Sequence, residues 1–280
     1  MRNILLALVL VTIPYLLPAQ ARAQENQRPI STCQAVAQNS VPVIKASASV
    51  QYAQALEPSE IRITYVGHST FRIEDANGLV IATDYAGFAG LGVVPDVVTM
   101  NHAHHTHFTI SPDPRIRHVL RGWGKPGSPA KHYLQVGDAL IRNVTTDIDN
   151  AFAGYEPNGN SIFIFEMGGL CIGHLGHLHH LPNDSQYAQI GRLDILMIPV
   201  DGGVTLNAQD MTKVVRRLNA SVVLTMHAFG EFSLQQFLAN MGEGFPIERT
   251  GASSATYSLN TLPTMPTVVV LKPESPLVVE

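Results

Sequence analysis

The sequence is poor in charge, and poorest in positive charge. Only 14% of the 280 residues are charged, with 18 Lys and Arg against 22 Asp and Glu, which gives a formal net charge of −4. A nucleic-acid partner is therefore not expected, because binding to a phosphate backbone depends on Lys and Arg. The hydrophobic content of 45% is typical of a compact globular protein, and we expect one folded domain.

The N-terminal apolar run is too short to span a membrane. It covers residues 4–17 and is interrupted by Thr12 and Pro14, whereas a spanning helix needs about 20 apolar residues. Ala21-Arg22-Ala23 follows, and a signal peptidase recognises this small-x-small pattern. We therefore predict a signal peptide over residues 1–23 and a periplasmic or secreted protein, with no membrane span after cleavage.

Cysteine is almost absent, since the chain contains only Cys33 and Cys171. An oxidising compartment would permit a disulfide bond between them. Cys171 also lies in an apolar run over residues 169–172, which is typical of a buried strand. Both interpretations stay open, because a disulfide needs the two Cα atoms within about 7 Å of each other.

Residues 24–60 are polar and rich in Gln, Ala and Ser, so we predict an N-terminal extension before a single domain of residues 61–280. The first half of this domain predicts strands, at residues 61–66, 70–74, 79–83, 96–100, 118–121, 133–136, 139–144, 161–166 and 170–174. The second half alternates strands at residues 194–200, 221–226 and 267–271 with helices at residues 207–218 and 232–241. This pattern predicts two sheets covered by helices.

Histidines gather at the ends of predicted strands. Ten of the twelve lie in two clusters and two single positions: His102, His104, His105 and His107; His174, His177, His179 and His180; His68; and His227. Imidazole is a common zinc ligand, and ligands at strand ends are held by a rigid scaffold. The clusters therefore predict a metal site, whereas His118 and His132 are expected to be solvated or hydrogen-bonded residues.

These blocks resemble the metallo-β-lactamase superfamily, and within it the branch of small hydrolases similar to ascorbate-phosphate lactonases. The resemblance spans residues 61–271 and depends on the order of six blocks, at residues 65–71, 81–85, 102–107, 174–180, 198–203 and 226–227. It implies an α/β (α+β) fold, a four-layer αββα sandwich with metals at one edge of its sheets. It also implies His102 and His104 as ligands of a first metal, and His107 and His227 as ligands of a second.

Two positions depart from the family pattern. Thr106 stands where the motif HxHxDH has aspartate, and His177 stands where the resemblance implies a carboxylate shared between two metals. An imidazole offers one lone pair and cannot bridge two cations, and the two missing negative charges no longer offset the charge of a second ion. We therefore predict one zinc ion per chain, with Mn or Fe as alternatives, held mainly by histidines: His102, His104, His107, His177 and His227.

Acidic residues also lie near the predicted site. By the resemblance, a further ligand comes from the loop after the strand at residues 139–144, where Asp147 and Asp149 are candidates and we predict Asp147 as the ligand. A turn-forming role for both aspartates is an equal alternative. Asp201 follows another strand and is predicted to be a general base or a hydrogen-bond partner of a ligand.

The resemblance implies that His68 and Asp84 brace the first hairpin below the metal. His105 and His179 occupy variable positions of their blocks and are expected to point away from it. His180 is expected to reach the substrate and is predicted, with Asp201, to be catalytic.

We predict an exported metal-dependent hydrolase in which the bound ion activates water for attack on a small-molecule lactone, ester, amide or phosphoester. The alternative is a non-catalytic metal- or ligand-binding protein on the same fold, which the missing aspartates favour.

An iron oxidoreductase is a weaker hypothesis, because non-haem iron sites combine two histidines with a carboxylate. β-Lactamase activity is a minor expectation, since a fold does not determine chemistry. The substrate and the oligomeric state do not follow from the sequence.

Overall fold

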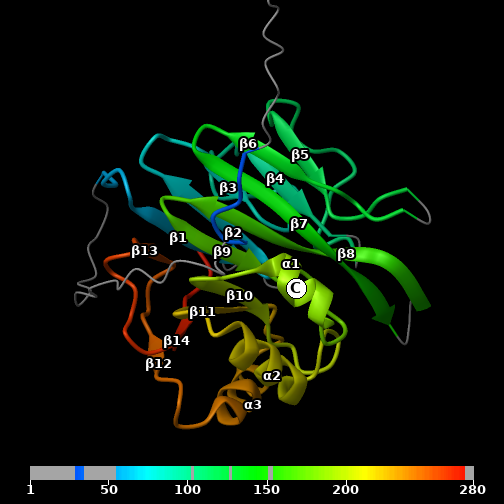
Figure 1. The fold of residues 1–280 in the computed structure, drawn as a ribbon, viewed down its shortest axis with the longest axis vertical. Coiled ribbons are helices and arrows are strands. Elements are labelled where there is room, and N and C mark those ends of the chain that lie inside the picture. The colour runs from blue at the N-terminus through cyan, green and yellow to red at the C-terminus, as the bar shows by residue number, and fades with distance from the viewer. Residues whose placement is uncertain (1–28, 35–54, 102–103, 126–127, 151–153, 275–280) are drawn as a thin grey trace, which may run out of the picture.

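The computed structural model describes residues 29–34, 55–101, 104–125, 128–150 and 154–274, which form two β-sheets and three helices (Figure 1). The six-stranded sheet has the order β13-β1-β2-β3-β4-β5, with bounds Ser254–Tyr257, Ile61–Gly67, Thr70–Asp75, Val80–Ala82, Val97–Met100 and His118–Arg121. The eight-stranded sheet has the order β12-β14-β11-β10-β9-β8-β7-β6, with bounds Ile247–Arg249, Thr267–Val270, Val222–Met226, Ile195–Pro199, Leu170–His174, Gly154–Met167, Ala139–Asn150 and Tyr133–Val136. The helices are α1 (Asp184–Ile190), α2 (Ala208–Leu218) and α3 (Glu231–Met241), and within the described residues none of them is long and apolar enough for a membrane crossing.

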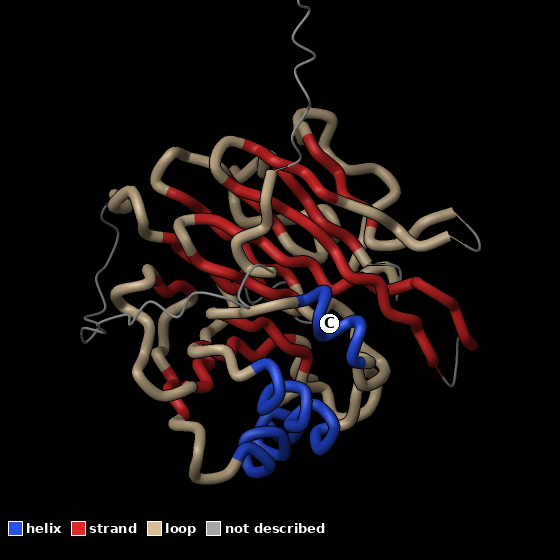
Figure 2. The backbone as a smooth tube through the Cα atoms, in the orientation of Figure 1, coloured by secondary structure: helices blue, strands red, loops and turns tan. Residues whose placement is uncertain are grey.

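The eight-stranded sheet lies between the six-stranded sheet and the helices, because successive side chains along its buried strands pack alternately against one and then the other. In β10, Ile195 and Met197 belong to the core shared with the six-stranded sheet, whereas Leu196 and Ile198 belong to the core shared with the helices. Successive side chains of a strand point to opposite faces, so a strand that is apolar at every position is buried on both. Figure 2 shows the helices together on one side of the strands.

The outer face of the six-stranded sheet is covered by loops in the described part of the chain. Val98 and Met100 of β4 pack there against Tyr85, Ala89 and Ile116, which lie in the segments after β3 and β4. The predicted α/β sandwich is confirmed, with loops rather than helices forming the fourth layer among the described residues.

A disulfide bond joins the N-terminal segment at residues 29–34 to the eight-stranded sheet. Cys33 and Cys171 are both buried, and their Cα atoms lie 5.9 Å apart. The structure therefore has the bridge that the sequence had left open. The predicted signal peptide at residues 1–23 lies outside the described residues, and the division into peptide, extension and domain stays a prediction.

A buried carboxylate holds the same segment in place. Glu166 of β8 accepts hydrogen bonds from Ser31 Oγ (2.6 Å) and from the backbone N–H of Thr32 (2.8 Å). Its other partner is Arg142 of β7, whose Nε lies 2.8 Å from Glu166 Oε1. Burial opposes the charge of Glu166, but these hydrogen bonds and the guanidinium outweigh it and lower the pKa of the carboxyl group.

Removal of the disulfide is expected to destabilise the protein. The double substitution Cys33→Ser and Cys171→Ser should lower the free energy of unfolding by about 2–5 kcal/mol, because the link closes a loop with a sequence separation of 138 residues. Urea denaturation followed by circular dichroism measures the difference, and the reduced wild type serves as the control because it should match the variant. Equal stability of oxidised and reduced wild type would contradict the prediction.

Candidate metal centre

The histidine blocks lie at one edge of the two sheets because parallel strands deliver them there. β9, β10 and β11 are parallel in one sheet, and β3 and β4 are parallel in the other. Side chains that follow the carboxyl ends of parallel strands meet in the crevice at one edge of the sheet. The segments after β4, β9, β10 and β11 bring together His104, His107, His177, Asp201 and His227.

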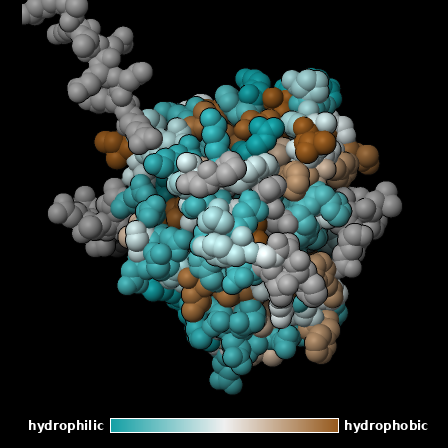
Figure 3. Space-filling model, turned by 90° about the vertical axis from the view of Figure 1, so that its right-hand side faces the viewer, coloured by the Kyte–Doolittle hydropathy of each residue, from teal (hydrophilic) through white to brown (hydrophobic). Residues whose placement is uncertain are grey.

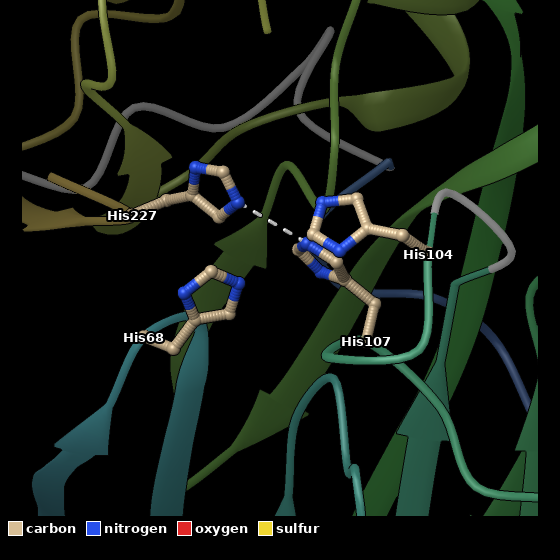
Figure 4. A group of neighbouring side chains, drawn as sticks. All are labelled: His68, His104, His107 and His227. Carbon is tan, nitrogen blue, oxygen red and sulfur yellow. Dashed lines mark hydrogen bonds between the residues drawn. The ribbon is translucent and has the colours of Figure 1, made fainter. Parts of the chain in front are cut away.

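Imidazole nitrogens converge at this edge. The ligand nitrogens of His68, His104, His107 and His227 all lie within 4.8 Å of one another (Figure 4). His107 Nε2 lies 3.3 Å from His227 Nε2, and His104 Nε2 lies 3.1 Å from His177 Nε2. Two nitrogens bound to one tetrahedral zinc at about 2.0–2.1 Å are separated by about 3.3 Å. The spacing therefore fits a single metal ion bound by imidazoles.

The loop after β9 approaches the six-stranded sheet closely enough that one position must be glycine. Gly176 has a φ of 61°, and a Cβ there would collide with the side-chain amides of Asn101 and Asn160. Asn160 Oδ1 accepts a hydrogen bond from the backbone N–H of His177 at 2.9 Å. These contacts fix the backbone from which the His177 ring reaches the cluster.

The four imidazoles whose Nε2 atoms make these short contacts also have a hydrogen-bond partner at their other ring nitrogen, Nδ1. The Nδ1 pairs are His107 with Asp84 (2.8 Å), His227 with Asp201 (3.0 Å), His104 with Thr106 Oγ1 (2.7 Å) and His177 with His179 Nε2 (2.7 Å). A carboxylate that accepts the Nδ1 hydrogen leaves the Nε2 lone pair free and fixes the plane of the ring. His107 and His227 are therefore held in the tautomer that a metal requires.

Asp84 is itself held by Asn101, the last residue before the first histidine cluster. Asn101 Nδ2 donates to Asp84 Oδ1 at 2.6 Å, and Asn101 Oδ1 accepts from the backbone N–H of Ser161 at 2.8 Å. Complete burial raises the pKa of Asp84 to about 6, because a charge is unfavourable away from water. The chain of contacts links both sheets to the orientation of His107.

Burial favours the neutral form of four of the clustered imidazoles. The pKa of His104 lies at about 4 and that of His68 at about 3, first because burial disfavours the charged form and then because His227 lies close to both. Burial, followed by neighbouring histidines, also holds the pKa of His107 and of His177 well below its ordinary range. Neutral imidazole is the form that binds metal, so these rings are ready to do so at neutral pH.

Thr106 bridges two rings at the position where the family motif has aspartate. Its Oγ1 lies 2.7 Å from His104 Nδ1 and 2.8 Å from His68 Nε2. A hydroxyl donates one hydrogen, so Thr106 accepts from one ring and donates to the other. When His104 Nε2 faces a metal, its Nδ1 donates to Thr106, which then donates to His68.

The structure places His68 in the cluster, although the sequence argument had assigned it only to bracing. Its φ of 51° lies in the left-handed region, at the turn between β1 and β2. The backbone oxygen of His68 accepts from Tyr65 Oη (2.8 Å) and from the backbone N–H of His227 (2.7 Å), so its backbone ties the β1–β2 turn to the segment after β11. Its ring, however, lies with its centroid 4.3 Å from that of His227. The pairing with Asp84 is not direct, because the Asp84 carboxylate contacts His107 instead.

Two of the predicted site residues lie apart from the cluster. Asp147 accepts hydrogen bonds from Tyr155 Oη (2.7 Å) and from the backbone N–H of Asn158 (2.8 Å), so its carboxylate serves the β7–β8 hairpin. His180 Nε2 accepts from the Asp147 backbone N–H at 3.1 Å. Asp147 thus lies within strand β7, at the register irregularity between Thr146 and Ile148, and not in a turn. Asp149 is exposed, and His102 lies outside the described residues.

Asp201 lies beside a ligand rather than free in the site. Besides His227, it accepts hydrogen bonds from the backbone N–H groups of Gly203, Val204 and Thr205 and from Thr205 Oγ1 (2.6 Å). Burial opposes its charge, but these hydrogen bonds outweigh it and hold the pKa of Asp201 below its ordinary range. The placement fits the predicted partner role, and it leaves no carboxylate oxygen free to act as a base.

His179 contacts His177 and does not point away as expected, whereas His105 is exposed, as its variable position predicted. His174 is buried outside the cluster, with Nε2 2.9 Å from the backbone oxygen of Ser69. The sequence predicted a structural role for His68 near the site and identified Thr106 as a departure from the family motif, but it did not predict the hydrogen bonds that link both residues to His104. The position of His68 in the turn at residues 67–69, at the end of a predicted strand, was the sequence feature that could have indicated its place in the cluster.

A sandwich of two sheets with clustered histidines at the carboxyl ends of its parallel strands defines a metallo-β-lactamase type of protein. Residues 62–227, more than half of the chain, match the family described as the beta-lactamase superfamily domain. The chain belongs to this superfamily.

Similar proteins agree with this assignment. The UPF0173 metal-dependent hydrolase of Methanoculleus marisnigri is 22% identical over 181 residues, covering 60% of this chain and 80% of its own. A crystal structure from Thermotoga maritima, assigned to a zinc-dependent hydrolase of the metallo-β-lactamase superfamily, is 28% identical with a TM-score of 0.56 and covers 75% of this chain and 98% of its own. An isothiocyanate hydrolase from Delia radicum gut bacteria shares the fold, with 12% identity, a TM-score of 0.52 and coverage of 71% and 100%. The predicted superfamily is confirmed, and the lactonase-like branch stays a prediction.

Zinc binding is expected to resist mild acid. Because the pKa of His104 lies at about 4 and burial lowers the pKa of His107 and His177 as well, protons compete little with zinc between pH 7 and pH 5.5. Imidazoles of ordinary pKa would each lose about tenfold in available neutral form over this range. We expect zinc affinity, measured by competition with an indicator dye calibrated at each pH, to fall by less than about tenfold. A fall of about a thousandfold would contradict the account.

Proposed function

We propose that the protein is an exported metal-dependent hydrolase that holds one zinc ion. The observation that supports this most is the convergence of four imidazole Nε2 atoms in two pairs, separated by 3.1 Å and 3.3 Å. A metal bound there would polarise the bond to be cleaved and lower the pKa of a bound water to about 7. The names of relatives at 22–24% identity, which describe metal-dependent hydrolases, point to the same activity.

Neutral donors favour one ion rather than two. His177 replaces the shared carboxylate, and its Nδ1 is already paired with His179, so it offers a single lone pair at Nε2. Thr106 brings no charge to the position of the second expected aspartate. Imidazole suits zinc, iron, copper and nickel, whereas manganese prefers carboxylate and water. Zinc is therefore the best match, and Mn is a weaker one.

The chain's own residues hold and orient the ligands. His104, His107, His177 and His227 would bind the metal, while Asp84 and Asp201 keep the rings of His107 and His227 in place. Because both carboxylates are engaged with imidazoles, neither is free to take a proton from water. His102 remains a proposed ligand, and Asp147 and His180 are less favoured in the roles proposed for them.

A second candidate function is metal binding without catalysis. Four imidazoles complete a tetrahedral shell, whereas a catalytic zinc site keeps one position open. The two functions differ in a measurable way. A natural binder would gain ester or phosphodiester hydrolysis only when both carboxylates are restored, by Thr106→Asp together with His177→Asp.

Export is supported by two features of the chain. The sequence at residues 1–23 has the pattern of a signal peptide. The disulfide between Cys33 and Cys171 favours an oxidising compartment, since cytosolic proteins seldom keep one. Mass spectrometry of the protein from its native cells should show a mature chain that begins at Gln24 in the periplasm or medium. A cytosolic chain that retains residues 1–23 would contradict export.

Hydrolysis is expected to depend on the clustered histidines. The zinc-loaded protein should cleave 4-nitrophenyl acetate, and dipicolinate should abolish the reaction by removing the metal. His177→Ala should lower both bound zinc, measured by elemental analysis, and kcat/KM, the latter by about a hundredfold. His118→Ala is the matched control, because His118 lies on β5 outside the cluster. Bound zinc without hydrolysis of any lactone, ester, amide or phosphoester would favour the non-catalytic alternative.

A further inference from the structure

Large apolar side chains are exposed in the three segments that follow β9, β10 and β11. We call them the apolar rim, and they are 40–82% exposed: Leu181, Val204, Phe229 and Phe232. Figure 3 shows the side of the molecule that lies to the right in Figure 1, where apolar patches are scattered among hydrophilic surface. Exposed apolar side chains that gather in one region mark a binding site more often than isolated ones do.

One residue of the rim, Phe229, lies directly beside the metal centre. The Phe229 ring centroid is 4.8 Å from that of His227 and 6.4 Å from that of His68. An apolar group placed on Phe229 would therefore lie next to the imidazoles that are expected to hold the metal.

Contacts between the loops show that the segments carrying three of the rim residues are neighbours. Leu206 N–H donates to Leu178 O at 2.7 Å, which joins the loop containing Val204 to the loop that leads to Leu181. A Cβ at Gly202 would lie 3.9 Å from Ser233 Cβ, which joins the same loop to the start of α3 beside Phe232.

The same segments lack the cations that an anionic substrate would need. Lys and Arg are absent from residues 174–183, 201–207 and 227–232. In the segment after β4, Arg115 pairs with Asp113 at 2.6 Å, and Arg117 pairs with Asp96. Recognition of phosphate or carboxylate groups commonly uses Arg or Lys. The surroundings of the site therefore suit a neutral substrate better than a phosphoester.

We propose that the substrate is a neutral carboxylic ester or lactone with an apolar group that lies against Phe229. This inference rests on the proposed hydrolase function and narrows its substrate class. In the reaction, the oxygen of water forms a bond to the acyl carbon and the bond from that carbon to the alcohol oxygen breaks. One proton of the water goes to the departing alcohol oxygen, which leaves a carboxylic acid and an alcohol.

The test compares 4-nitrophenyl esters from acetate to octanoate with zinc-loaded protein. The wild-type kcat/KM should rise about threefold to fourfold for each methylene that the rim removes from water. Phe229→Ala should lose at least about tenfold more on octanoate than on acetate, and Phe229→Leu should restore most of the dependence on chain length. Ile30→Ala is the control, because Ile30 is 85% exposed in the N-terminal segment away from the rim and its loss should change nothing.

Two results would overturn the proposal. One is a kcat/KM that does not rise with chain length in the wild type, and the other is an equal loss on acetate and octanoate in Phe229→Ala, which would show a structural role only. Binding of the protein to phosphatidylcholine vesicles, abolished by Phe232→Ala without any dependence on ester length, would assign the rim to a lipid surface instead and would also overturn it.

A ligand that cannot be hydrolysed separates this inference from the proposed function. Calorimetry with 2-decanone, a neutral apolar ketone, measures binding whether or not esters are cleaved. If no ester is cleaved but 2-decanone binds and Phe229→Ala weakens this binding at least tenfold, the hydrolase proposal fails and the apolar site stands. If 2-decanone does not bind and chain length has no effect, the apolar site fails even where short esters are cleaved.

Discussion

Hydrogen bonds from imidazole Nδ1 atoms to two buried carboxylates are the constraint on which the metal centre depends. In the six-stranded sheet, Asp84 follows β3 and binds His107, which follows the adjacent parallel strand β4. In the eight-stranded sheet, Asp201 follows β10 and binds His227, which follows the adjacent parallel strand β11. Each sheet thus contributes one carboxylate and one imidazole from adjacent strands. Because Nδ1 is engaged, the lone pair of each ring lies at Nε2, and the Nε2 atoms of His107 and His227 lie 3.3 Å apart, where a bound cation would offset the cost of gathering them.

The replacement of carboxylates by neutral donors has consequences for chemistry as well as for metal number. Thr106 and His177 bring hydrogen bonding and one lone pair to positions where the family pattern has negative charge. The surrounding loops are similarly short of free charge, and Phe229 lies against the ring of His227. By our proposal, such a site holds one cation, has no carboxylate free to act as a general base and takes neutral esters or lactones as substrates. The disulfide between Cys33 and Cys171 supports the proposal of export, because disulfide bonds persist mainly in oxidising compartments.

The sequence predicted most of the regular structure and the place of the site, since both follow from local patterns. The helices expected at residues 207–218 and 232–241 are observed as Ala208–Leu218 and Glu231–Met241. The short helix α1 was missed because its signal is an Asn183 capping box with few apolar residues. The network among His68, Thr106 and His104 was missed because those contacts arise only when the β1–β2 turn meets the loop after β4. Asp147 illustrates the opposite error: the resemblance made it a candidate ligand in the segment after residues 139–144, but strand β7 continues through it and its carboxylate bonds to Tyr155 instead.

X-ray absorption spectroscopy of the zinc-loaded protein tests the central claim most directly, because it reports the identity, number and distance of the atoms around the metal. The account predicts imidazole nitrogens as the main scatterers at about 2.0–2.1 Å, with no second metal within about 4 Å. A metal–metal distance of about 3.5–4 Å, or a shell made largely of carboxylate oxygens, would contradict it.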